Sequence, residues 1–101
     1  MKQIINGKRY DTNTAVLLCE EGAGLGRNDF KFWEEELYLK RTGEYFLCGK
    51  GGAMSSWATT YSDGTRGYGD GIRPLTESEA RQWVERHAND EFESLFGTCP
   101  E

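Results

Sequence analysis

The residues of this sequence that could do chemistry are first its cysteines and its single histidine. Cys19, Cys48 and Cys99 are irregularly spaced, no CxxC pair occurs, and His87 is the one histidine. A zinc site or a disulfide framework needs regularly spaced ligands or paired cysteines, so we expect neither, and no metal or cofactor. Cys48 and His87 are the one pair to test as a nucleophile with its base, but no motif places them together. The sequence therefore predicts a protein that is not an enzyme.

Two glycine-rich segments could, by composition, cradle a phosphate. Residues 22–26 read GAGLG and residues 49–52 read GKGG. The first follows a predicted helix instead of a strand, and the second lacks the GxxxxGK[ST] spacing. We therefore expect neither segment to bind a nucleotide.

The acidic residues are concentrated at the C-terminal end. The net charge is −5; residues 1–75 hold ten basic and ten acidic residues, whereas residues 76–101 hold two basic and seven acidic ones. Direct binding of nucleic acid is disfavoured because phosphate contacts need a basic face, and a protein partner with a basic surface is favoured. An ordinary solvated acidic helix is the alternative. The predicted partner-binding carboxylates are Glu77, Glu85, Glu91 and Glu93.

Residues 49–71 form a long irregular region with seven of the thirteen glycines. Trp57, Tyr61 and Tyr68 are interleaved among them. Aromatic side chains in a glycine-rich loop are typical of a recognition surface, so these three residues are further candidates for partner binding. The alternative is that they fold back and cover the core.

Periodicity and turn signals predict the elements of the N-terminal half. Asn6-Gly7 predicts a hairpin over residues 2–12, since both positions of a type I′ turn need positive φ. The apolar run at residues 14–21 predicts a buried helix, capped by Asp11 or Thr12 and ended by Gly22. A central hairpin is expected, with strands at 37–40 and 44–48. The three glutamates at 34–36 either protect an exposed strand edge from pairing with another chain or form part of a binding face.

The C-terminal half carries the clearest local signal. A short edge strand over residues 72–75 precedes Thr76 and Glu79, which have the spacing of a capping box. The helix that follows presents one apolar stripe, and Asp90 is expected to cap a last short helix. The inward residues are Ala80, Trp83, Val84 and His87, then Phe92, Leu95 and Phe96.

These elements predict an α+β fold in the order ββ-α-ββ-β-α-α, a small antiparallel sheet of about five strands with helices packed on one face. A length of 101 residues fits a single domain over residues 1–101. No apolar leader and no stretch of membrane-spanning length is evident, so we expect a soluble cytoplasmic protein without membrane contacts.

Several short motifs occur in a distinctive order along the chain, at residues 5–12, 36–38, 41–47, 51–55, 72–76, 79–80 and 83. In the order of these motifs, the chain resembles a group of small bacterial and phage proteins encoded on mobile genetic elements. The resemblance implies a role in the cytoplasm of a bacterial host, as an inhibitor of defence systems of the anti-CRISPR kind, and it carries over no functional residues. It leaves out residues 84–101.

Three functional hypotheses follow. The leading one is a non-enzymatic inhibitor that binds a nuclease effector complex, such as a CRISPR effector, and blocks access of nucleic acid through its acidic surface. The second is an adaptor or regulatory module of a mobile element that has no nuclease target. The third is a small enzyme centred on Cys48 and His87.

Overall fold

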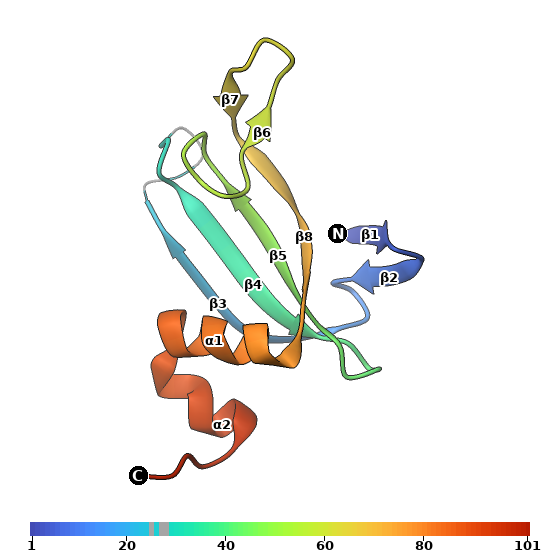
Figure 1. Cartoon of the computed structure of the whole chain (residues 1–101), viewed down its shortest axis with the longest axis vertical. Coiled ribbons are helices and arrows are strands. Elements are labelled where there is room, and N and C mark those ends of the chain that lie inside the picture. The colour runs from blue at the N-terminus through green and yellow to red at the C-terminus, as the bar shows by residue number, and fades with distance from the viewer. Residues whose placement is uncertain (25, 27–28) are drawn as a thin grey trace.

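The computed structural model describes residues 1–24, 26 and 29–101 as an α+β protein. At its centre lies a four-stranded antiparallel sheet with the order β3-β4-β5-β8, and two small hairpins and the helices surround it (Figure 1). The predicted α+β class is confirmed: among these residues four strands form the central sheet, where about five were expected, and the other four form two separate two-stranded hairpins. The elements are β1 (Lys2–Ile5), β2 (Lys8–Asp11), β3 (Val16–Ala23), β4 (Trp33–Leu39), β5 (Tyr45–Gly51), β6 (Thr59–Thr60), β7 (Arg66–Gly67), β8 (Gly69–Leu75), α1 (Glu77–His87), the 3-10 turn η1 (Asn89–Glu91) and α2 (Phe92–Phe96).

The predicted helix over residues 14–21 is wrong, because this segment is the edge strand β3. A short apolar run suits a buried helix or a buried strand equally well, and only pairing decides between them. Here β3 pairs antiparallel with β4 from Val16 opposite Leu39 to Ala23 opposite Trp33. The predicted helix cap is wrong too: the Asp11 side chain accepts a hydrogen bond from the Asn13 amide at 2.9 Å and so closes a turn.

Both predicted hairpins are confirmed. Asn6 and Gly7 have φ of 51° and 78°, as a type I′ turn between β1 and β2 requires. The central hairpin pairs β4 with β5 from Trp33 opposite Gly51 to Leu39 opposite Tyr45. Gly43, with φ of 90°, occupies the left-handed position in the connecting turn.

Each face of the central sheet carries its own apolar core. On one face α1 packs over Leu37 and Leu47, and the buried cluster continues through Ala80, Trp83 and Val84. On the other face the β1–β2 hairpin contributes Tyr10, which packs with Tyr38, Phe46 and Ile72. Helix packing on one face is thus as predicted, and a separate two-stranded hairpin covers part of the other.

The glycine-rich region is more regular than expected. Residues 49–51 belong to β5, residues 69–71 belong to β8, and the short β6–β7 hairpin lies between them. This hairpin projects beyond the end of the central sheet that lies away from the helices (Figure 1). The predicted edge strand over residues 72–75 is the second half of β8, which lies at the edge of the sheet.

The capping box at the start of α1 is confirmed. The Thr76 hydroxyl accepts from the Glu79 amide at 3.1 Å, and the Glu79 carboxylate accepts from the Thr76 amide at 2.8 Å. The expected cap at Asp90 is wrong: η1 occupies that position, and α2 begins without a side-chain cap. Within the described residues, no helix is both long enough and apolar enough to cross a membrane.

Candidate functional site

A buried carboxylate joins three parts of the fold. Glu35 of β4 is 8% exposed, and each of its oxygens accepts a hydrogen bond at 2.7 Å from a tryptophan indole. Trp83 comes from α1, and Trp57 comes from the segment between β5 and β6. Two donors satisfy both oxygens of a group that is costly to bury alone. Glu35 therefore belongs to the architecture of the core.

The structure places Trp57 in the core and not on the surface. Trp57 is 8% exposed, and its ring lies so close to β5 at Gly49 that a Cβ added there would overlap the ring. The Arg73 guanidinium covers the ring at 4.2 Å from its centroid. Trp57 therefore folds back and covers the core, which was the alternative to a role in partner binding.

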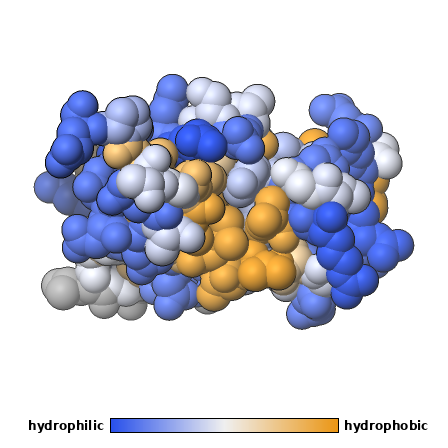
Figure 2. Space-filling model, turned by 90° about the horizontal axis from the view of Figure 1, so that it is seen from below, coloured by the Kyte–Doolittle hydropathy of each residue, from blue (hydrophilic) through white to orange (hydrophobic). Residues whose placement is uncertain are grey.

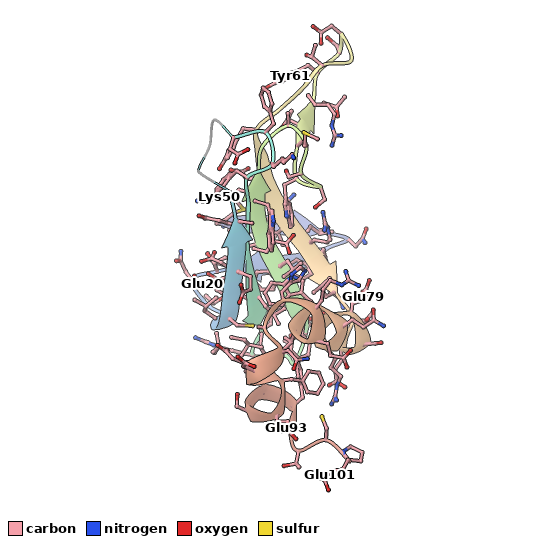
Figure 3. All side chains as sticks on the ribbon, turned by 90° about the vertical axis from the view of Figure 1, so that its left-hand side faces the viewer. Glu20, Lys50, Tyr61, Glu79, Glu93 and Glu101 are labelled. Carbon is pink, nitrogen blue, oxygen red and sulfur yellow. The ribbon has the colours of Figure 1, made fainter. Side chains whose placement is uncertain are left out.

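The two tyrosines of the glycine-rich region differ in their surroundings. Tyr61 is 54% exposed and lies just after β6, whereas Tyr68 is half-buried between β7 and β8. Figure 3 shows Tyr61 at the opposite end of the molecule from Glu93. The predicted aromatic and acidic contact residues therefore do not form one surface.

The four predicted glutamates are all exposed but are not equivalent. Glu77 pairs with Arg81 at 3.6 Å, and Arg81 also stacks over Phe96 of α2 at 5.0 Å. The Glu93 carboxylate accepts from the Cys99 amide at 2.7 Å. Glu85 and Glu91 are also on the surface. The Arg81 guanidinium and the hydrogen bond of Glu93 thus interrupt the acidic helical surface that the sequence suggested.

A second group of carboxylates arises where β3 pairs with β4. The register sets Glu20 opposite Glu36 and Glu21 opposite Glu35. Because side chains alternate along a strand, Glu20 and Glu36 lie on one face of the sheet and Glu21 lies on the other. A hollow of about 470 Å³ surrounds this part of β3, lined by Glu20, Glu21, Gly22, Ala23, Gly24, Phe32, Glu34, Glu35 and Glu36.

These strand carboxylates continue into the acidic turn after α1. Glu21 lines a shallow hollow together with Asp90 and Glu91 of η1, and Arg86 lies in its wall. Burial, followed by the negative charges of Glu91 and Glu21, raises the pKa of the Cys19 thiol to about 11. We name the group formed by Glu20, Glu21, Glu36, Asp90 and Glu91 the acidic edge.

No salt bridge reaches the acidic edge among the residues that the structure describes, although Arg86 lies near Glu21 and Glu91 and the charge of Glu36 acts on Lys50. The ion pairs of the sheet and its turns lie elsewhere: Lys50 with Glu34 at 3.2 Å, and Glu44 with Lys8 and Lys40 at 2.9 and 3.1 Å. Across those described residues, no lysine or arginine forms a salt bridge with the acidic edge. No group of three or more histidine, cysteine or acidic side chains in this part of the chain could hold a metal ion.

Cys48 and His87 lie on opposite faces of the sheet. Cys48 packs at the edge of the cluster under the β1–β2 hairpin, whereas the His87 ring lies 5.2 Å from both Trp33 and Trp83 on the helix face. Burial, with the nearby Glu36 carboxylate, raises the pKa of the Cys48 thiol above its usual value. The structure therefore does not bring this pair together as a nucleophile and its base.

Sequence reasoning missed Glu20 and Glu21 as site residues because it placed them at the end of a helix. The signal that could have found them is the pair of acidic runs, at residues 20–21 and 34–36, within segments able to pair as strands. Comparison of the chain with protein-family models, with curated proteins and with solved structures gave no match.

Proposed function

We propose that this protein is a non-enzymatic binding protein that covers a basic surface of a protein partner with its acidic edge. One observation carries the proposal: three elements, β3, β4 and η1, gather five carboxylates around one edge of the sheet, and no described lysine or arginine pairs with them. Carboxylates without ion-pair partners on a chain of net charge −5 raise the rate of encounter with a positively charged surface and repel nucleic acid.

The partner class that we put first is a nuclease effector complex of bacterial defence, such as a CRISPR effector. Such a complex binds nucleic acid in a groove lined by lysine and arginine. The carboxylates of the acidic edge, gathered from β3, β4 and η1, would occupy the positions of phosphates in that groove and so exclude the nucleic acid. The resemblance to proteins of mobile genetic elements supports this choice, and the protein would act in the bacterial cytoplasm.

Two matched charge variants test the proposal. The first neutralises four of the five carboxylates of the acidic edge (Glu20→Gln, Glu21→Gln, Asp90→Asn, Glu91→Gln), and the second neutralises the helical and terminal surface (Glu77→Gln, Glu85→Gln, Glu93→Gln, Glu101→Gln). Both variants lose the same charge. Tagged proteins are used to capture partners from a bacterial lysate that contains CRISPR effector complexes, and mass spectrometry identifies them.

We expect the wild type and the second variant to capture a nuclease complex, and the first variant to lose it by at least about tenfold, as for the loss of several charge contacts. The captured complex should also cleave its nucleic-acid target more slowly. Equal capture by both variants would place the interface away from the acidic edge. Capture of a partner with no nuclease activity would contradict the proposal that the protein inhibits a nuclease.

An adaptor or regulatory function without a nuclease target is the second candidate, and one observation favours it. Tyr61 is 54% exposed close to the projecting β6–β7 hairpin, and exposed tyrosines are frequent anchors of protein interfaces. For an adaptor that uses this hairpin, Tyr61→Ala should weaken partner capture while neutralisation of the acidic edge leaves it unchanged. The inhibitor proposal expects the reverse.

A further inference from the structure

The two edges of the central sheet differ in how they are closed. At β8 the outward-facing amide of Ile72 donates to the Gln3 side chain at 3.3 Å. Two residues further along, the backbone points the same way, and Pro74 there has no N–H to offer. A side chain from the β1–β2 hairpin and a proline therefore block this edge against another strand.

Among the described residues the opposite edge, β3, has neither a covering side chain nor a proline, although a β-bulge between Leu17 and Cys19 interrupts its pairing with β4. The strand is eight residues long, it contains no proline or lysine, and Figure 1 shows it at the outer side of the sheet with no strand beyond it. In the part of the chain that the structure describes, no side chain or loop hydrogen-bonds to the backbone of β3. The regular stretch after the bulge, residues 19–23, is a template for pairing with a further strand.

We propose that β3 is a docking edge at which an extended basic segment of a partner protein adds as a fifth strand to the four-stranded sheet. The inference rests on the proposed function, namely the binding of a basic partner, and adds the way in which that partner is held. Backbone hydrogen bonds to β3 give affinity for any extended chain, and the side chains along the edge choose the sequence.

The charges along β3 select a pattern of two adjacent basic residues. Glu20 and Glu21 point to opposite faces of the sheet, with Glu36 beside the first and Glu35 beside the second. Consecutive residues of an added strand also alternate between the faces. A Lys-Arg pair at neighbouring positions therefore meets one carboxylate on each face, whereas two basic residues separated by one position meet carboxylates on one face only.

The same glutamates exclude a second copy of this chain from the edge. An antiparallel pair of β3 strands that overlap at their centres sets Glu20 or Glu21 opposite or diagonal to a glutamate of the other copy. Like charges in those positions destabilise a strand pair. The edge is thus closed to self-association and open to a basic partner.

Both ends of β3 suit an incoming chain. At the start, Val16 and Leu17 are 60% and 45% exposed. Figure 2, which views the molecule from below, shows an apolar area between hydrophilic ones at this end of the molecule. At the far end, Gly22, Ala23 and Gly24 carry little side chain and lie in the wall of the hollow of about 470 Å³. An added segment would pack apolar side chains at the first end and approach the backbone closely at the second.

The experiment titrates a synthetic peptide of about ten residues into the ¹⁵N-labelled protein. The peptide consists of valine and threonine around one Lys-Arg pair. A peptide of the same composition has the two basic residues one position apart. Two further versions carry N-methyl groups on alternate residues, so that each blocks one edge of the peptide. Amide exchange with deuterium and NMR shifts report where the peptide binds.

We expect shifts and slower exchange in β3, with β8 unchanged. One N-methylated peptide should bind about tenfold more weakly or worse, because it cannot donate to β3, while the other binds as before. The peptide with separated basic residues should also bind more weakly. Neutralisation of Glu20 and Glu21 to glutamine should remove the preference for the adjacent pair.

Three results would overturn the inference. Equal binding of both N-methylated peptides, with shifts confined to the backbone amides of the acidic residues, would mean contact through charge alone, which leaves the proposed function intact. No shift in β3 at millimolar peptide would mean that the edge takes no strand, and partner capture would still test the proposed function independently. A dimer in sedimentation that protects β3 without peptide would make a second copy the occupant.

Discussion

At the scale of single residues, the contact that most distinguishes this core is the carboxylate of Glu35 between two indoles. Trp57 and Trp83 are separated along the chain by most of the glycine-rich region and by β8, yet both donate to the same side chain at 2.7 Å. Apolar packing alone is nondirectional, whereas two hydrogen bonds fix the orientation of both rings. Glu35 therefore sets how α1 and the segment before β6 sit on the sheet.

Removal of the Glu35 carboxylate should destabilise the fold in proportion to the donors left unpaired. Glu35→Gln keeps one acceptor and should cost about 1–2 kcal/mol, whereas Glu35→Ala leaves both indole N–H groups buried and unpaired and should cost about 2–5 kcal/mol. Urea unfolding followed by circular dichroism measures both. Glu34→Gln is the matched control, since Glu34 is exposed on the other face, and it should change stability by less than about 0.5 kcal/mol. Equal stability of Glu35→Ala and wild type would contradict this account.

At the scale of elements, the β1–β2 hairpin is held to the sheet by an apolar cluster, by the hydrogen bond between Gln3 and Ile72, and by one carboxylate. Glu44, just before β5, accepts from Lys8 of the hairpin and also from Lys40 and Thr42 of its own turn. These hydrogen bonds and charges hold the pKa of the Glu44 carboxyl near 2, below its usual 4.5. The contact ties together two hairpins that are far apart in the sequence.

The low pKa of Glu44 predicts a pH-dependent share of stability. Because the folded-state pKa is lowered, this share is fully present above about pH 4.5 and is lost as the pH falls towards 2. Thermal unfolding of the wild type and of Glu44→Gln should therefore differ at pH 6 and converge near pH 2. An NMR titration should find the Glu44 midpoint near 2. A difference in unfolding temperature that is the same at both pH values would contradict the assignment.

At the scale of the whole molecule, the sheet lies between two unequal covers. α1 and the chain after it cover one face, and the β1–β2 hairpin covers part of the other. The molecule is elongated, 48 × 33 × 20 Å, because the β6–β7 hairpin and α2 extend from opposite ends. Both acidic and aromatic groups reach the surface, but at different places, so two partners could be distinguished by which end they contact.

Local stability should follow this arrangement. β4 and β5 are paired on both sides and carry the fully buried Leu37 and Phe46, whereas β6 and β7 are two-residue strands outside the core. Amide exchange measured by NMR should be slowest in β4 and β5 and fastest in β6 and β7, as expected for opening that costs little where few apolar contacts are broken. Comparable protection of β6 and β5 would show that the projecting hairpin is part of the cooperative unit.

The accuracy of the sequence reasoning depended on how local each signal was. Asn6-Gly7 and the capping box of Thr76 and Glu79 act within a few residues, and the structure confirms both. The apolar run at residues 14–21 carried no local signal that distinguishes a helix from a strand, and the predicted helix there was wrong. Glu20 and Glu21 were missed for the same reason, since their place in the acidic edge exists only once residues 20–21 stand beside residues 35–36.

By itself, the sequence determined the α+β class, the turns that need positive φ, the start of α1 and the net acidity of the chain. Each of these depends on backbone preferences or on composition, which are properties of the residues themselves. Only the tertiary structure decided that Trp57 is buried on Glu35, that Cys48 and His87 are apart, and that β3 is an open edge bearing Glu20 and Glu21. Those features depend on which strands pair and in what register, and pairing is set by contacts between residues distant in the chain.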